Sequence, residues 1–288
     1  MDAAHKPVTP VVWMPETVQE AFALYQEHSP DAEWIAGGTW RQVEREKGKA
    51  FAGNVIVLER IFGLASWQEE EKYVRIGACM TLEQLIEEPV ISREILGEAM
   101  RRIAAPAVRT RGTIGGNIMY GHGDILPALI AMQAELEIWN GESYARIPVE
   151  EAASYDGVFL LTAVLLPKTP EAGSDELHFF EKIGRREAFT ASLLAVSGCV
   201  RRQENGSAWA RLALVGGKDA PVRLRRAEAC VAEPGWTPEA FFEALAADYQ
   251  PEDEPFSSGN YRLQAAAHLF LSHLWLDGKA EKGGVHKT

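Results

Sequence analysis

The segment Val108–Asp124 reads VRTRGTIGGNIMYGHGD and contains five glycines and two arginines in seventeen residues. Glycine loses more conformational entropy on folding than any other residue, so a cluster of glycines indicates left-handed backbone angles or the close approach of another group. A tight turn requires one or two glycines, not five. The segment is therefore the first candidate for a binding site in this chain.

The composition is that of a globular protein with room for two or three domains. The chain has 288 residues, of which 47% are hydrophobic and 24% charged. The longest apolar run, Val158–Pro167, is shorter than the ~20 residues that span a bilayer, so we expect a buried strand and no membrane span. No secretory signal pattern is recognised. The net charge of −12 argues against a nucleic-acid partner, because phosphate binding requires a concentrated basic face.

Cysteine usage favours a reducing environment. The three cysteines, Cys79, Cys199 and Cys230, are odd in number and form no C-x-x-C pair. We therefore expect a cytoplasmic protein without an iron–sulfur or structural zinc site of its own. His122 and Asp124 stand close together, but zinc sites need three or four ligands, so no metal is expected there. The arginines at 223, 225 and 226 are expected to be solvated or ion-paired.

Apolar periodicity and capping signals predict a mixture of helices and strands. Thr17 and Thr81 have the character of N-caps, and Asp124 is predicted to cap a helix in the same way. The expected helices cover residues 17–28, 81–88, 92–104, 125–133, 238–248 and 259–276. The expected strands cover residues 33–36, 55–58, 73–80, several short pieces from 135 to 167, and 177–184, 192–200 and 210–217.

A domain boundary is predicted at 167–175, because this segment is rich in Pro, Gly and Ser. After it come strands, with a turn signal at 204–207, and then two helices, an order that predicts an α+β unit.

Two glycine turns suggest a phosphate-binding function. Gly37-Gly38-Thr39 lies between an expected strand and an expected helix, where backbone N–H groups can form an anion site, although such a turn alone is more often structural. The second turn, Gly112–Asn117, adds side-chain donors from Thr113 and Asn117. Two turns with donors fit a diphosphate held from two sides, as in a dinucleotide. Neither a Walker loop nor a G-x-G-x-x-G fingerprint occurs, so a flavin is favoured over a nicotinamide.

The motifs Ala36–Thr39 and Val108–Asn117 resemble those of the FAD-binding subunit of molybdenum hydroxylases, the xanthine dehydrogenase and carbon monoxide dehydrogenase family. The likeness continues through residues 182–188, 214–223 and 258–262 in the family's order, so it covers nearly the whole chain. It implies a two-lobed FAD-binding domain of the vanillyl-alcohol-oxidase type at 1–170, with lobes of about 1–60 and 61–170. A C-terminal α+β flavoprotein domain at 175–278 and a polar tail at 279–288 would follow.

The resemblance also implies site residues. Backbone amides of 35–41 and 112–117, with Thr39 and Thr113, would hold the FAD diphosphate. Asp124 would lie near the ribityl chain, Leu161 along the cofactor and Lys182 near the flavin ring. Ile103 stands where some relatives place an aromatic residue over that ring. The expected cofactor-binding residues are Ile35, Ala36, Gly37, Gly38, Thr39, Trp40, Arg41, Ile103, Gly112, Thr113, Gly115, Gly116, Asn117, Tyr120, Asp124, Leu161 and Lys182.

One departure from the family concerns the end of the opening segment. Relatives usually place nine steps and a Ser-Pro core between the asparagine and the aspartate, whereas Asn117 and Asp124 are seven steps apart and enclose IMYGHG. This shortened loop is expected to line the flavin, where Tyr120 and His122 would tune access of the acceptor.

The resemblance implies an electron-transfer subunit without catalytic residues of its own. Iron–sulfur clusters and a molybdenum cofactor would lie on two partner subunits, and electrons would pass through FAD to NAD⁺ or another acceptor. The motif at 36–40 favours xanthine dehydrogenase and purine catabolism. The alternatives are a carbon monoxide, aldehyde or N-heterocycle dehydrogenase, a self-sufficient FAD oxidoreductase, and a scaffold subunit that has lost its flavin.

Overall fold

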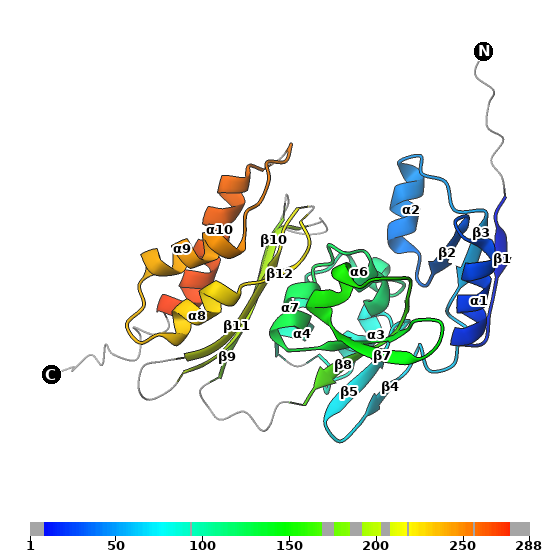
Figure 1. Ribbon diagram of the computed structural model, residues 1–288, viewed down its shortest axis with the longest axis horizontal. Coiled ribbons are helices and arrows are strands. Elements are labelled where there is room, and N and C mark those ends of the chain that lie inside the picture. Colours follow the sequence, from blue (N-terminus) through cyan, green and yellow to red (C-terminus); the bar gives the residue numbers. More distant parts are fainter. Residues whose placement is uncertain are drawn as a thin grey trace, which may run out of the picture.

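The computed structural model describes residues 9–92, 94–168, 176–184, 192–202, 208–217, 219–255 and 257–276. Three sheets, each with its own helices, follow one another along the long axis of the molecule (Figure 1). The predicted α+β fold class is confirmed. The predicted turn at 204–207, the tail at 279–288 and most of the segment 167–175 lie outside the described residues. No helix in the described part of the chain is long and apolar enough to cross a membrane.

The first sheet is small and parallel, with strand order β1-β3-β2. Thr17 caps α1, as predicted, and α1 packs Ala21 and Phe22 into the core of this part. The predicted unit of strand, glycine turn, helix and strand is present, with Ile35 beside Val57 in the two paired strands. The elements are β1 (Val11–Trp13), α1 (Val18–His28), β2 (Ala32–Ile35), α2 (Thr39–Glu46) and β3 (Asn54–Val57).

The second sheet has five antiparallel strands in the order β4-β5-β8-β6-β7. Its central strand β8 (Leu160–Pro167) is buried at every position except the last, which confirms the predicted buried strand. The other strands are β4 (Trp67–Glu69), β5 (Tyr73–Gly77), β6 (Glu135–Trp139) and β7 (Tyr144–Pro148). The helices are α3 (Leu82–Glu87), α4 (Glu94–Arg101), α5 (Pro106–Arg109), α6 (Ile114–Met119), α7 (Leu126–Ala131) and η1 (Val149–Ser154).

The helix predicted at 92–104 is shorter in the structure. Ala104 adopts a φ of 45°, and Pro106 occupies the first position of the separate helix α5. Proline suits this position because its missing N–H would have no partner there, and it disfavours helical backbone in the residue before it. The Thr81 cap of α3 is confirmed, with a reciprocal bond from Gln84.

The third sheet is an antiparallel meander in the order β12-β11-β10-β9, followed by three helices, where two were predicted. Strand β12 and helix α8 were not expected. Helices α8, α9 and α10 cover one face of the sheet (Figure 1), around a core that includes Leu212, Phe241 and Phe270. The elements are β9 (Glu176–Gly184), β10 (Ser192–Arg202), β11 (Ala208–Val215), β12 (Val222–Arg223), α8 (Arg225–Ala232), α9 (Pro238–Asp248), α10 (Gly259–Leu271) and η2 (Ser272–Leu276).

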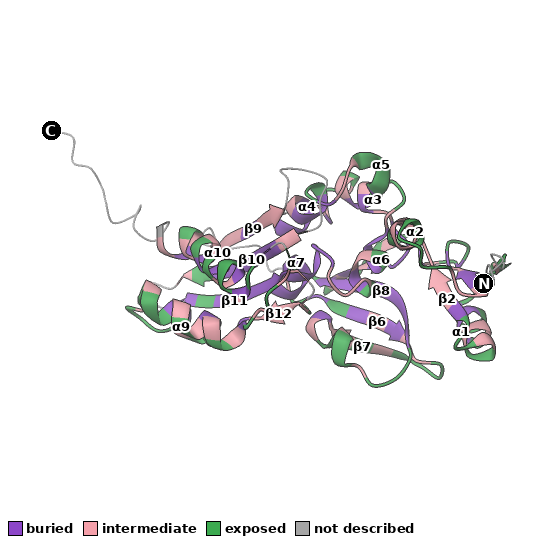
Figure 2. Ribbon diagram, turned by 90° about the horizontal axis from the view of Figure 1, so that it is seen from above, coloured by how far each residue is buried: buried purple, intermediate pink, exposed green. Residues whose placement is uncertain are grey.

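The opposite face of the third sheet packs against the second part of the molecule. Ala128 and Ala131 of α7 contact a separate apolar cluster that includes Ala195 and Val215. Strands β10 and β11 are therefore largely buried, as Figure 2 shows. Because this sheet is covered on both sides, the C-terminal part is joined to the rest through an apolar interface.

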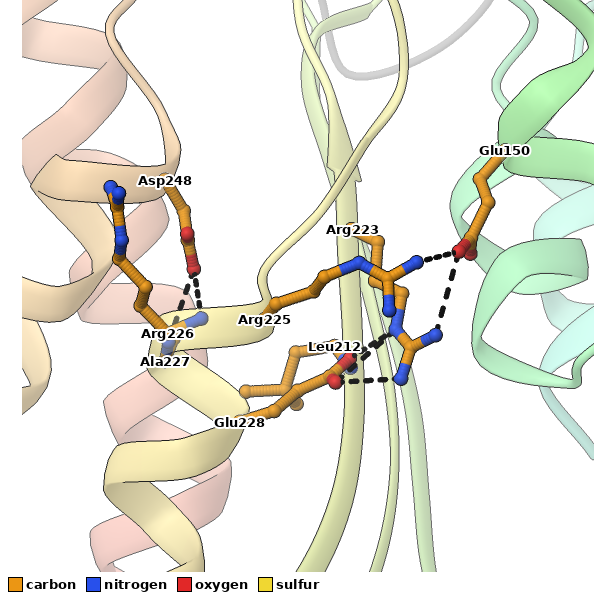
Figure 3. A network of polar contacts seen from close by, with 8 residues as sticks. All are labelled: Glu150, Leu212, Arg223, Arg225, Arg226, Ala227, Glu228 and Asp248. Carbon is orange, nitrogen blue, oxygen red and sulfur yellow. Dashed lines mark hydrogen bonds and ion pairs between the residues drawn. The ribbon is translucent and has the colours of Figure 1, made fainter.

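An ion-pair network lies at the edge of the same interface (Figure 3). Arg223 pairs with Glu228 at 2.9 Å, and both Arg223 and Arg225 reach Glu150 of η1. The carboxylate of Asp248 accepts hydrogen bonds from the N–H groups of residues 226 and 227 and so caps α8 from a distant part of the chain. The predicted ion pairing of the basic cluster is confirmed, and it links η1 to the C-terminal part.

Candidate functional site

The structure brings the two glycine segments into contact. A Cβ atom on Gly37 would lie 1.7 Å from the carbonyl oxygen of Arg111, and one on Gly112 would lie 3.6 Å from the Thr39 hydroxyl oxygen. Gly37 is buried at this contact. The residues 36–41 and 111–117 thus form a single site, although they are far apart in sequence.

The first segment presents unpaired backbone donors at the start of α2. Gly38 is the N-cap of α2, with a φ of 66° that favours glycine, and it provides no side-chain cap. The N–H groups of Thr39, Trp40 and Arg41 have no hydrogen-bond partner among the described residues. We call these the open N–H groups of α2. Together with the helix dipole, they form a site suited to a phosphate group.

The second segment differs, because it is a short helix and not an open turn. In the first turn of α6, the N–H of Ile114 donates to Met80 (3.0 Å), that of Gly115 to Ala78 (2.9 Å) and that of Gly116 to the Thr113 hydroxyl (3.0 Å). The expectation that its glycines expose free amides is therefore wrong for these positions. Met80 and Ala78, in the connection from β5 to α3, satisfy the groups that a helix start leaves unpaired.

The two glycines of α6 have different environments. A Cβ on Gly115 would lie 2.6 Å from the Ala78 carbonyl oxygen, so this glycine is required by packing. Gly116 is exposed, and a Cβ there would meet only the Thr113 hydroxyl, at 3.0 Å. Gly116 and Tyr120 are four residues apart and lie on one side of α6, whereas Gly112 precedes the helix. Gly112 approaches Thr39 and Tyr120 packs on Trp40, so the side of α6 that carries Gly116 and Tyr120 lies next to α2.

The side chains of Arg41 and Asn117 have structural partners. Arg41 donates to both carboxylate oxygens of Glu33 (2.6 and 3.1 Å) and to Glu44 (2.7 Å), and its pKa is raised chiefly by the hydrogen bond to Glu33. Asn117 accepts a 3.4 Å hydrogen bond from the Ile125 N–H and so holds the following loop. The backbone N–H of Arg41 is among the open donors of this site, whereas its side chain is held by Glu33 and Glu44.

A buried ion pair lies where the shortened loop meets the C-terminal part. Lys182 Nζ donates to Asp124 (2.5 Å) and to the Arg102 carbonyl (3.0 Å), and the Ser192 hydroxyl donates to the other Asp124 oxygen (2.5 Å). The prediction that Asp124 caps a helix is wrong, because Ile125 occupies the N-cap position of α7 without a side-chain bond. A buried carboxylate needs such partners to offset its desolvation. Asp124 and Lys182, two expected site residues, are therefore in direct contact.

The expected residues Ile103 and Leu161 belong to the core. They are 8% and 4% exposed and lie in the same apolar cluster. The Ile103 carbonyl accepts a hydrogen bond from the buried side chain of Arg109. Arg109 also pairs with Glu83 at 2.8 Å and donates to the carbonyls of residues 101 and 104. Sequence reasoning did not identify the role of Arg109 or Ser192. The first arginine of VRTRG was the only sequence signal for Arg109, and no sequence signal pointed to Ser192.

A chain of ring contacts crosses the site. The Trp40 and Tyr120 rings are 4.2 Å apart, the Tyr120 and His122 rings are 5.5 Å apart, and His122 Nδ1 lies 3.0 Å from the Asp219 carbonyl oxygen. Burial, then Asp124 and then Glu44 raise the pKa of Tyr120, so it remains a neutral phenol. The shortened loop therefore connects α2 to the C-terminal part.

A pocket of about 300 Å³ borders the second segment at the end that precedes α6. Burial, and to a lesser extent Glu59, raise the pKa of its Cys79 thiol to about 12. The lining residues are Glu59, Ala65, Cys79, Thr81, Gln84, Thr110, Arg111 and Thr113.

Comparison with known proteins agrees with the resemblance in the glycine segments. Residues 6–169 match the family described as the FAD binding domain in molybdopterin dehydrogenase. The chain is 32% identical over 228 residues to the carbon monoxide dehydrogenase medium chain of Hydrogenophaga pseudoflava, covering 74% of this chain and 75% of that one. It is 25% identical over 261 residues to the xanthine dehydrogenase FAD-binding subunit of Escherichia coli O157:H7, covering 86% and 88%.

The fold is also similar to a solved structure. A chain in the carbon monoxide dehydrogenase of Hydrogenophaga pseudoflava that lacks the Mo-pyranopterin moiety of the molybdenum cofactor superposes with a TM-score of 0.83. The sequence identity is 24%, and the match covers 94% of this chain and 98% of that one. The family match spans more than half of the sequence, and this chain belongs to the family of FAD-binding domains of molybdopterin dehydrogenases.

Proposed function

We propose that this chain is the electron-transfer subunit of a multi-subunit molybdenum hydroxylase and holds FAD between its two glycine segments. The observation that carries the proposal is the set of open N–H groups at the start of α2, next to the side of α6 that carries the exposed Gly116 and Tyr120. Unpaired backbone donors at a helix N-terminus, next to a surface without side chains, suit a diphosphate. FAD, when bound, supplies the redox chemistry, and the protein supplies binding and orientation.

The surroundings of the two glycine segments suggest which end of FAD lies at which side of α6. The Asp124–Lys182 pair lies beyond the C-terminal end of α6, whereas the 300 Å³ pocket lies beside the residues that precede this helix. We assign the flavin end to the side of Asp124 and Lys182 and the adenosine end to the pocket. On this assignment, Ile103 and Leu161 support the flavin end from within the core, because their side chains are buried.

The relatives and the cysteines support the proposed partners and the proposed location. The similar chains are named as a medium chain and a FAD-binding subunit, which are components of larger enzymes. We therefore place the iron–sulfur clusters and the molybdenum cofactor on partner subunits, with NAD⁺ or another compound as the final acceptor. None of the three cysteines forms a disulfide, which suits the reducing cytoplasm.

The substrate of the complex is a separate question. The identity is 32% to the carbon monoxide dehydrogenase chain and 25% to the xanthine dehydrogenase chain, so these values do not favour the expected xanthine branch. Carbon monoxide, aldehydes and N-heterocycles remain alternatives. Purification of the native complex, with assays for flavin, iron and molybdenum and for oxidation of each substrate, discriminates among them.

The FAD site is tested by the exposed glycine of α6. We expect Gly116→Leu to abolish FAD binding, because its side chain would occupy the space in front of the open N–H groups. The free energy of unfolding of the FAD-free protein should change by less than about 1 kcal/mol, as for other exposed positions. Flavin content from the visible absorption spectrum, together with denaturant unfolding, measures both effects.

Gly116→Ala is the matched control for this variant. Its Cβ meets only the Thr113 hydroxyl, so most of the bound FAD should be retained. Normal flavin content in the leucine variant would contradict the assignment of this site.

A further inference from the structure

Helix α2 is weakly anchored for an element that carries a binding site. None of its residues is buried, and Trp40 is 37% exposed. The polar contacts of Arg41 with Glu33 attach one side of α2 to β2. Most helices in folded proteins are positioned by a buried apolar face, so α2 must be positioned by other contacts.

The ring contact with Tyr120 supplies such a contact. Trp40, the second residue of α2, packs on Tyr120 with the ring centroids 4.2 Å apart. The ammonium of Lys47, at the C-cap of α2, lies 5.3 Å from the centroid of the same indole ring. Tyr120 in turn meets the edge of His122. Neither Tyr120 nor His122 belongs to an apolar core cluster, so these contacts add little to the cores of the molecule.

The other end of the chain of contacts is linked to a buried arginine. His122 approaches the Asp219 carbonyl oxygen, and this contact requires a hydrogen on Nδ1. The Asp219 carboxylate accepts from Arg262 at 3.0 Å and from the Tyr249 hydroxyl at 3.3 Å. Arg262 is fully buried and also donates to the Gly216 carbonyl at 3.0 Å. His122 is therefore attached to a partly exposed aspartate whose carboxylate pairs with a fully buried arginine.

We propose that Tyr120 and His122 are positioning residues of the cofactor site. They form a strap that connects α2 to the C-terminal part, keeps the open N–H groups of α2 opposite Gly116, and thereby slows the dissociation of FAD. The inference rests on the proposed FAD site and adds residues of the shortened loop, where this chain departs from the spacing of its family. The strap acts through Trp40 and Asp219 and does not require contact between His122 and the cofactor.

The chemistry of each contact predicts which substitutions preserve the strap. Tyr120 acts through its ring, and its hydroxyl has no hydrogen-bond partner among the described residues, so Tyr120→Phe should behave as the wild type. Tyr120→Ala removes both ring contacts. His122→Asn keeps an N–H donor near the position of Nδ1, whereas His122→Phe keeps a ring beside Tyr120 but cannot bind the Asp219 carbonyl.

The test is the rate at which the purified complex releases FAD after dilution, followed by the recovery of free-flavin fluorescence. We expect Tyr120→Ala to release FAD roughly tenfold faster, the effect of one strong aromatic pair. His122→Phe should release it about threefold faster, as expected for part of one hydrogen bond. Tyr120→Phe and His122→Asn should restore rates within about twofold of the wild type.

The control is Tyr144→Ala, which removes another half-exposed aromatic contact, with Trp139 at 5.0 Å, remote from the site. Its FAD release should match the wild type. If Tyr120→Ala and His122→Phe both release FAD at the wild-type rate, the strap is overturned. If Tyr120→Ala fails to fold, the difference between His122→Phe and His122→Asn decides. A wild-type protein that takes up no FAD would instead refute the proposed function, before any variant is compared.

Discussion

The two glycine segments share the letters GG but use them for different physical reasons. At the start of α2, Gly38 provides a left-handed backbone and leaves three N–H groups open, and the helix buries none of its residues. At the start of α6, the N–H groups are satisfied by Met80, Ala78 and Thr113, and three residues of the helix are buried. In the proposed FAD site, the first segment would therefore supply the hydrogen-bond donors, and the second would form the packed surface opposite them.

The largest effect is expected where the two segments touch. Gly37→Val would place a side chain against the Arg111 carbonyl, 1.7 Å from an ideal Cβ, so the segments would have to separate. We expect the free energy of unfolding to fall by about 3 kcal/mol, the upper range for overpacking, and FAD binding to be lost. Denaturant unfolding and flavin content measure this. A stable, yellow Gly37→Val protein would show that the contact between the segments is not required.

A smaller loss of stability is expected within α6. Gly115→Ala should lower the free energy of unfolding by about 1–3 kcal/mol even without FAD, because its Cβ would lie 2.6 Å from the Ala78 carbonyl oxygen. Gly116→Ala, one residue further, serves as the control and should change it by less than about 1 kcal/mol. Equal unfolding curves for the two alanine variants would remove the distinction between a packing glycine and an exposed one.

A still smaller loss of stability is expected when the N-cap residue of α6 is replaced. Thr113→Ala removes the acceptor of the Gly116 N–H and should destabilise the FAD-free protein by about 1 kcal/mol. Thr39→Ala removes a hydroxyl at the first position of α2 that makes no hydrogen bond among the described residues, so its effect on stability should be smaller. Thermal unfolding of both variants without FAD makes the comparison, and a larger loss for Thr39→Ala would reverse it.

The smallest effect at neutral pH is expected at Cys79, in the pocket beside the second segment. Its pKa is raised by burial from 9.0 to about 12, so alkylation near pH 8 should be slow. The unfolded chain ionises near 9 while the folded chain stays protonated, so this thiol's contribution to stability is complete below pH 9 and is lost between pH 9 and 12. Rates of alkylation across this range, with Cys79→Ser as the control, measure it. Rapid reaction of the folded protein at pH 8 would contradict the burial.

Much of the fold follows from local signals. The caps at Thr17 and Thr81, the buried strand near 160–167 and the helix 238–248 appear where periodicity predicts them. Helix α8 was missed because its N-terminal donors are satisfied by Asp248, which follows it by more than twenty residues. A cap supplied from a distant part of the chain leaves no local signal.

At the candidate site, too, some features follow from local sequence and others depend on distant residues. The residue types in the two glycine segments were sufficient to suggest a diphosphate and to indicate the family. The sequence could not show that Asp124 binds Lys182 and Ser192 in place of capping a helix, because those partners lie 58 and 68 residues away. It also could not separate the packing role of Gly115 from the exposed position of Gly116.

The sequence alone determined the family, the α+β class and the positions of the two glycine segments, because these depend on local composition, spacing and capping. Only the tertiary structure decided which N–H groups remain open, since that depends on whether Met80, Ala78 or another distant carbonyl reaches them. It also decided that Tyr120 and His122 connect α2 to Asp219. Hydrogen-bond satisfaction is a property of the whole fold, because each donor's partner is chosen by the packing of remote segments.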